Sequence, residues 1–135
     1  MKRIAKLGGI LCMVIALSGC AVVIKTENGR ENRSYELMDI RDVPQELRTK
    51  IEEKWAQPFE LTYSDMEYLY MVKGYGKKEE SGFCIEIAEC TESQDAICIE
   101  VILHGPGGKG VVCDTEYPFC VLKTAYTEKQ VIFEE

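Results

Sequence analysis

A two-residue alternation of apolar and polar side chains runs through most of the chain after residue 59. Such runs predict β-strands with one buried face, and the Gly-, Pro- and Ser-containing segments between them predict turns. The runs cover residues 59–63, 67–73, 83–88, 97–103, 117–123 and 130–133, and a weaker alternation covers residues 35–40. Because only a polar segment separates 83–88 from 97–103, these two runs predict a β-hairpin. Gly74 and Gly76 are expected to end the run 67–73.

One earlier segment has the period of an amphipathic helix instead. Its apolar positions recur every four residues and are Leu47, Ile51 and Trp55. Asp42 is predicted to cap this helix, with Gln45 completing a capping box and Pro44 in the first turn. The helix is expected to end before Pro58. We expect the apolar stripe to pack on the domain's own sheet, with docking of a partner as the alternative.

These elements place the chain in the mainly β class with one helix, an α+β fold. We expect an antiparallel β-sandwich or a partly open barrel, covered on one side or end by the single amphipathic helix. Residues 34–135 are enough for a single β-rich domain with its own core.

The N-terminus has the pattern of a bacterial lipoprotein signal. Basic residues precede an apolar run from Leu7 to Leu17, and the sequence Leu-Ser-Gly-Cys ends at Cys20. The run is too short for a transmembrane helix, which needs about 20 apolar residues. We therefore predict a signal peptide over residues 1–19 and attachment of fatty acyl chains such as palmitate at Cys20. A lipidated N-terminus and solvated tether over residues 20–33 would then hold the domain on the extracytoplasmic face of the cell membrane.

The charge of the chain restricts its partners. The full sequence has a net charge of −7, with 16 basic and 23 acidic residues. Removal of the predicted signal takes away three basic residues and no acidic ones, which leaves a net charge of −10. Such a surface repels nucleic acid and other anionic polymers, so we expect a basic or neutral protein partner and no nucleic acid.

Five cysteines follow the predicted lipid-attachment residue: Cys84, Cys90, Cys98, Cys113 and Cys120. Their odd number leaves at least one thiol unpaired, and small buried hydrophobe is the commonest role for such residues. A disulfide between Cys90 and Cys98, which flank the predicted hairpin turn, stays open as an alternative, although a slip of one residue would turn them to opposite faces. The single histidine and the absence of a CxxC pair argue against a metal site, and no cofactor is expected.

Residues with catalytic chemistry are sparse in this sequence. His104 is the only histidine, no nucleophile motif surrounds Ser81, and the glycine-rich segment 105–110 lacks the Lys-Ser/Thr pair of a phosphate-binding loop. A small hydrolase that uses His104 with Asp114 or Cys113 is the least favoured alternative. We therefore do not expect an enzyme.

Binding is expected from two loops, because loops on a rigid sheet carry binding residues more often than the sheet itself. These loops are 77–83 and 104–110. Their candidate partner-binding residues are Glu80, Ser81, Gly82, Phe83, His104, Gly105 and Pro106.

Residues 67–135, about half the chain, resemble the C-terminal domain of the protease complex subunit PrcB family. The matching pieces are 67–76 (EYLYMVKGYG), 82–87 (GFCIEI), 103–106 (LHGP), 117–123 (YPFCVLK) and 131–134 (VIFE). Family members usually have Thr-Gly-Gly-Tyr-Ser where this chain has Glu80 to Cys84, so only the second glycine is shared. The resemblance implies a non-catalytic accessory module, often a lipoprotein, that binds and stabilises a surface protease.

Together these observations predict a lipid-anchored, extracytoplasmic binding module that stabilises a surface protease or another protein partner. A loop-presenting protease inhibitor is the alternative within the binding class. The two differ in outcome, because an inhibitor would slow the protease and a stabiliser would prolong its activity.

Overall fold

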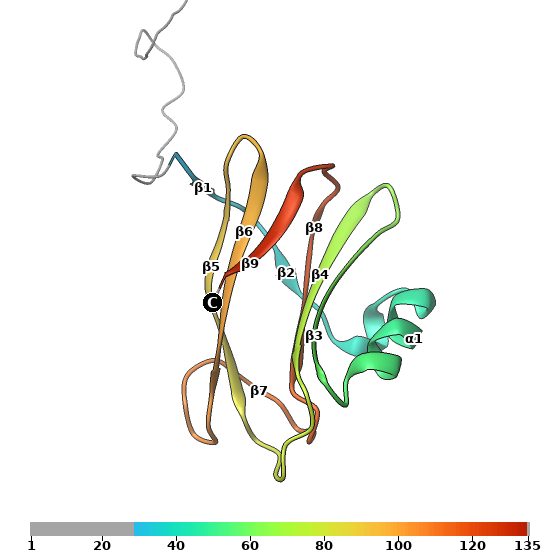
Figure 1. Ribbon diagram of the computed structural model, residues 1–135, viewed down its shortest axis with the longest axis vertical. Helices are drawn as coiled ribbons and strands as arrows, with labels where there is room; N and C mark the ends of the chain where they lie inside the picture. The colour runs from blue at the N-terminus through green and yellow to red at the C-terminus, as the bar shows by residue number, and fades with distance from the viewer. Residues whose placement is uncertain (1–28, 135) are drawn as a thin grey trace, which may run out of the picture.

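Two β-sheets face each other across a shared core in the computed structural model, which describes residues 29–134 (Figure 1). The elements within these residues are β1 (Glu31–Asn32), β2 (Glu36–Leu37), a 3-10 helix (Ile40–Asp42), α1 (Gln45–Lys54), β3 (Pro58–Ser64), β4 (Tyr68–Tyr75), β5 (Cys84–Glu92), β6 (Ala96–His104), β7 (Val111–Val112), β8 (Phe119–Ala125) and β9 (Gln130–Glu134). The mainly β prediction with one covering helix is confirmed, and of the two architectures expected the molecule is a sandwich.

The first sheet has the strand order β1-β5-β6-β9, with the short β7 also paired to β5. The second sheet has the order β2-β8-β4-β3. Strands β5 and β6 form the predicted hairpin, in which Cys84 lies opposite His104 at one end and Glu92 lies opposite Ile97 at the other.

The last strand departs from the antiparallel pairing expected of the sandwich. β9 runs parallel to β6, with Gln130 opposite Ala96 and Glu134 opposite Glu100. The reason is the short connection from β8, which crosses between the sheets at the end where β6 begins. A strand that starts there must run in the same direction as β6.

The core between the sheets comes from one face of each strand. Its fully buried members include Met71 of β4, Ile97 and Ile99 of β6 and Leu122 of β8. These residues occupy alternate positions of their strands, as the period-two pattern predicts. Burial of large aliphatic side chains on both inner faces is what holds the two sheets together.

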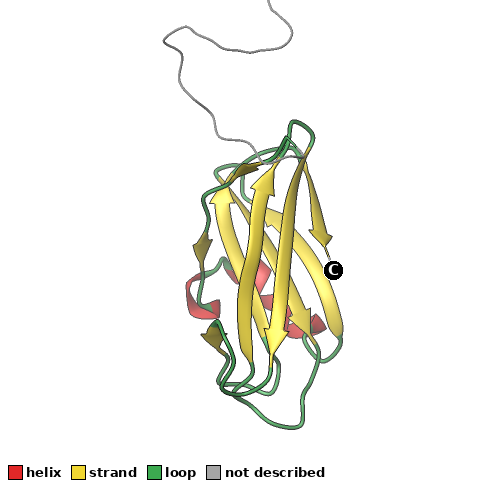
Figure 2. Ribbon diagram, turned by 90° about the vertical axis from the view of Figure 1, so that its left-hand side faces the viewer, coloured by secondary structure: helices red, strands yellow, loops and turns green. Residues whose placement is uncertain are grey.

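The apolar stripe of α1 covers the outer face of the second sheet, which confirms packing on the domain's own sheet. Leu47 and Ile51 are fully buried against Tyr70, Val72 and Val121. Trp55 continues the stripe by stacking on Tyr117, with ring centroids 5.1 Å apart. In Figure 2 the first sheet is in front and α1 lies behind, so the helix and the first sheet are on opposite sides of the second.

The predicted capping box of α1 is wrong. Asp42 ends the 3-10 helix, and Pro44 holds the N-cap position with no side-chain cap. The carboxylate that does cap a turn is that of Asp39, which accepts a hydrogen bond from the Arg41 N–H at 2.8 Å. The guanidinium of Arg48 then donates to the carbonyls of Ile40 and Arg41 and ties α1 to this turn.

The end of β4 also differs from the prediction. The strand continues through Gly74 to Tyr75, and Gly76 with φ 78° follows it. Gly74 is tolerated inside the strand because the ring of Phe59 on β3 lies directly over it, where a β-carbon would overlap the ring. The glycine here permits close aromatic packing and does not mark a turn.

The expected tether ends earlier than residue 33. Glu31 and Asn32 form β1, and the side chains on either side of it are anchored to the sandwich. Arg30 lies 2.7 Å from Glu89 and 3.0 Å from Glu134, and the Arg33 guanidinium lies 2.8 Å from Glu92. The composition of this segment is that of a solvated chain, but its charges find partners on β5 and β9. The predicted signal peptide and Cys20 lie outside the described residues.

The sandwich core gives a direct test of the fold. Replacement of the fully buried Ile99 by alanine is expected to lower the free energy of unfolding by about 2 to 5 kcal/mol, because it leaves a cavity between the sheets. Ile132 on the neighbouring strand β9 is 40% exposed, and its replacement by alanine should cost less than about 1 kcal/mol. Urea unfolding of both variants measures the difference, and equal losses would contradict this core assignment.

Candidate functional site

The two loops expected to bind a partner lie side by side at one end of the sandwich, the lower end in Figure 1. A β-carbon on Gly82 would lie 3.9 Å from the β-carbon of Pro106. A third segment joins them, because the N–H of Gly82 donates to the carbonyl of Cys113 at 2.8 Å. The N–H of Lys78 likewise donates to the carbonyl of Glu116 at 2.7 Å. We call residues 77–83, 104–112 and 113–117 the loop surface.

The loop surface and the first described residues lie at opposite ends of the molecule. β1 pairs with the last two residues of β5, where Glu31 lies opposite Glu92. The first residue of β5, Cys84, lies opposite His104 beside the loop surface. The length of β5 therefore separates the start of the described chain from the loops.

The individual candidates differ in exposure. Glu80, Ser81, Gly105 and Pro106 are exposed, whereas Gly82, Phe83 and His104 are half-buried. Gly82 has φ 94°, a conformation that glycine adopts without strain. The carbonyl of Phe83 accepts from the N–H of Cys113 at 2.8 Å, so this residue fixes the loop to its neighbour.

Two apolar residues of the loop surface escaped the sequence analysis. Val111 and Val112 are 55% and 58% exposed, although they form the edge strand β7. Their β-branched side chains favour a strand. A strand of two residues is too short to show an alternation of buried and exposed positions, so the sequence did not indicate that both side chains are exposed. The glycine run just before them was the available signal, since it places them at the end of a loop.

His104 does not meet either of the partners that the hydrolase alternative requires. Its Nε2 lies 2.8 Å from Oε1 of Glu86, a neighbour on the outer face of the first sheet. Burial raises the pKa of the Cys113 thiol, which is the opposite of the change that activates a nucleophilic cysteine. The geometry therefore gives His104 a carboxylate partner on its own sheet.

The structure contains no bridge between Cys90 and Cys98, the alternative that the sequence left open. All five cysteines within residues 29–134 are free thiols. Cys90 lies opposite Ile99 and Cys98 lies opposite Thr91, so their side chains point to opposite faces of the first sheet. A register shift between Ile87 and Glu89 produces this arrangement, because it reverses the alternation on β5.

Burial explains the chemistry of these thiols. It raises the pKa of Cys90 to about 11 and that of Cys120 to about 12, because the thiolate would lose its hydration. These two thiols are members of the core between the sheets. Their role as small buried hydrophobes is the one that the sequence favoured.

No group of three His, Cys, Asp or Glu residues within 29–134 is placed to hold a metal ion. In the same part of the chain, no helix has the length and apolar character needed to cross a bilayer. A cavity of about 80 Å³ opens between the sheets beside Val111 and Cys113. It is well below the roughly 300 to 1,000 Å³ usual for small-molecule pockets.

Comparison of the chain with protein-family models, with curated proteins and with solved structures found no match. The resemblance to the PrcB family therefore remains a prediction from the sequence pieces.

The thiol assignment predicts the outcome of alkylation without a reductant. In denaturant, Cys84, Cys90, Cys98, Cys113 and Cys120 should each take up one alkylating group, because none is bridged. Mass spectrometry of the peptides measures this. A pair that stays unmodified and reacts only after reduction would contradict the assignment.

The buried thiols also predict a pH dependence of stability. The unfolded thiol loses its proton near its ordinary pKa of 9.0, whereas folded Cys120 keeps it to about 12. The difference in pKa leaves the free energy of unfolding unaffected below pH 9. As the pH rises toward 12, the free energy of unfolding falls by about 1 kcal/mol per pH unit, because only the unfolded thiol loses its proton. Urea unfolding at pH 8 to 10.5 should show a shallower decline for Cys120→Ala than for the wild type.

The matched control for this experiment is Leu122→Ala, which removes a buried side chain from the same strand without removing a thiol. It should lower stability at every pH and keep the wild-type slope. An unchanged slope in Cys120→Ala would show that this thiol does not contribute.

Proposed function

We propose that the protein is a lipid-anchored, extracytoplasmic and non-catalytic binding module whose loop surface holds a protein partner. The family resemblance makes a surface protease the candidate partner, and stabilisation of that protease the candidate effect. The predicted lipid on Cys20 supplies the membrane attachment.

One observation carries this proposal. The three segments of the loop surface meet at the end of the sandwich opposite the first described residues. A chain anchored through its N-terminus would thus present these loops away from its point of attachment. Backbone hydrogen bonds from Gly82 to Cys113 and from Lys78 to Glu116 hold the segments together, so they can act as one preformed surface.

The composition of the loop surface suits a protein partner. Val111 and Val112 supply exposed apolar area. Exposed charged side chains lie on the other segments of the loop surface, namely Lys77, Glu79, Glu80, Asp114 and Glu116. An apolar centre with a polar rim is the usual anatomy of a protein interface. The small cavity beside Val111 could accept one aliphatic side chain of the partner.

Photo-crosslinking in intact cells tests the proposal. A photoreactive amino acid at Val112 or at Ser81, both exposed, should give a covalent adduct with one partner that mass spectrometry identifies. The same amino acid at Thr62, an exposed position on β3, serves as the matched control and should give no such adduct. Adducts of equal yield at all three positions, or none at the loop positions, would contradict the proposal.

If the partner is a protease, its activity distinguishes the two outcomes within the binding class. Addition of the protein should prolong the activity of the protease if it stabilises the enzyme. A slowed initial rate would assign the loop-presenting inhibitor instead.

A further inference from the structure

Met66 is an apolar side chain presented at the tip of the turn between β3 and β4. It is 86% exposed, and its φ of 74° is the one positive value among the non-glycine residues of 29–134. Asp65 fixes this turn, because its Oδ1 accepts from the N–H groups of Glu67 and Tyr68 at 3.1 and 2.8 Å. Glycine or asparagine would adopt this conformation with less strain. The methionine therefore adds cost to the turn and gains little packing within the domain, which points to a contact outside it.

Tyr126 extends this apolar tip. It is 42% exposed, and its backbone N–H donates to the carbonyl of Glu67 at 3.1 Å, so the β8 to β9 connection lies against the Met66 turn. A tyrosine combines an apolar ring with a polar hydroxyl, which suits the boundary between lipid and water. We call Met66 and Tyr126 the apolar tip.

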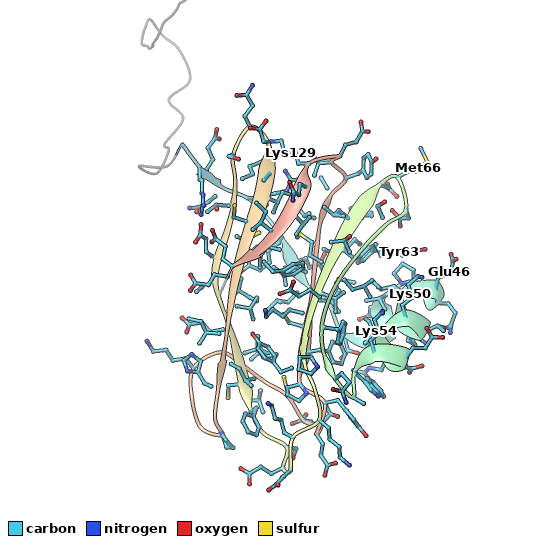
Figure 3. The ribbon with its side chains drawn as sticks, in the orientation of Figure 1. Glu46, Lys50, Lys54, Tyr63, Met66 and Lys129 are labelled. Atoms are coloured by element: carbon cyan, nitrogen blue, oxygen red, sulfur yellow. The ribbon has the colours of Figure 1, made fainter. Side chains whose placement is uncertain are left out.

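The apolar tip lies at the same end of the sandwich as the start of the described chain. Figure 1 shows β1 and the β3 to β4 turn at this end, and Figure 3 labels Met66 there. Gly29 comes nine positions after Cys20, with eight residues between them. Even fully extended this stretch spans about 30 Å, so a lipid on Cys20 would keep this end close to the bilayer.

We propose that this end of the sandwich rests on the lipid surface, with Met66 and Tyr126 inserted among the headgroups. The contact rests on the proposed lipid anchor at Cys20 and fixes the orientation that the anchor alone leaves free. It places the loop surface about 30 Å farther from the bilayer, since β5 has nine residues and each strand residue rises about 3.3 Å.

The charges around the tip determine which lipid it contacts. Asp65, Glu67 and Glu128 are exposed beside the turn and oppose binding to anionic headgroups. The ammonium of Lys123 lies over the ring of Tyr68, 3.9 Å from its centroid, and faces Asp65 of the same turn. The ammonium of Lys129 is held by Glu92 at 2.7 Å and by the carbonyl of Ser93 at 2.9 Å. The contact is therefore driven by burial of the apolar side chains, and the lipid at the tip is zwitterionic.

Fluorescence quenching by brominated phosphatidylcholine tests this contact. The full chain, processed and lipidated by a bacterial host, is reconstituted into vesicles with bromine placed near the headgroups. Met66→Trp and Tyr126→Trp add a reporter at the tip, and Val112→Trp adds the matched control at the opposite end. The natural Trp55, stacked on Tyr117 of the loop surface, is an internal reference in every variant.

The expected result is a loss of the added emission in M66W and Y126W, with V112W and Trp55 unquenched. If the variants float with the vesicles but the tip reporters keep their emission, or V112W is quenched equally, the contact is overturned and the anchor stands. Failure of the protein to float overturns the anchor and the contact together. If the tip reporters keep their emission because two copies of the chain cover each other's tip, sedimentation will show a dimer. That result also overturns the lipid contact.

Discussion

The structure depends on the burial of the second sheet on both of its faces. One face of β4 and β8 packs into the core between the sheets through Met71 and Leu122, and the other packs under α1 through Val72 and Val121. Strands that are covered on both sides cannot shift their register without exposing large side chains. The turns and loops at both ends of this sheet are therefore fixed in place, and with them the apolar tip and the loop surface.

A second constraint joins the two ends of the described chain to the first sheet. The guanidinium of Arg30 reaches Glu89 on β5 and Glu134 on β9, while β1 itself pairs with β5. These side chains are only partly exposed, so the ion pairs are less screened than pairs on an open surface. The first described residues are therefore held beside the β5 to β6 turn and far from the loop surface.

The sequence predicted those parts of the fold that depend on local periodicity. Ile97, Ile99 and Val101 alternate regularly, and the hairpin predicted from this pattern is confirmed. The register shift between Ile87 and Glu89 was not predicted, because a single extra residue leaves no mark on composition. This shift turns Cys90 and Cys98 to opposite faces of the sheet. The parallel pairing of β9 and the partners of Arg30 depend on contacts between segments more than 30 residues apart. For the candidate site, the sequence found both loops but could not show that they meet, nor that Val111 and Val112 are exposed beside them.

The two ends of the same strands differ in what they offer to other molecules, and this difference links the fold to the proposed function. At one end, short turns carry the exposed apolar side chains of Met66 and Tyr126. At the other end, longer segments bring together apolar, charged and glycine-rich residues, which is the variety that specific recognition of a protein requires. The strands run from one end of the sandwich to the other, so a membrane contact at the apolar tip would give the loops a defined height and direction. A partner on the same membrane would then meet an oriented surface, and less orientational freedom would be lost when it binds.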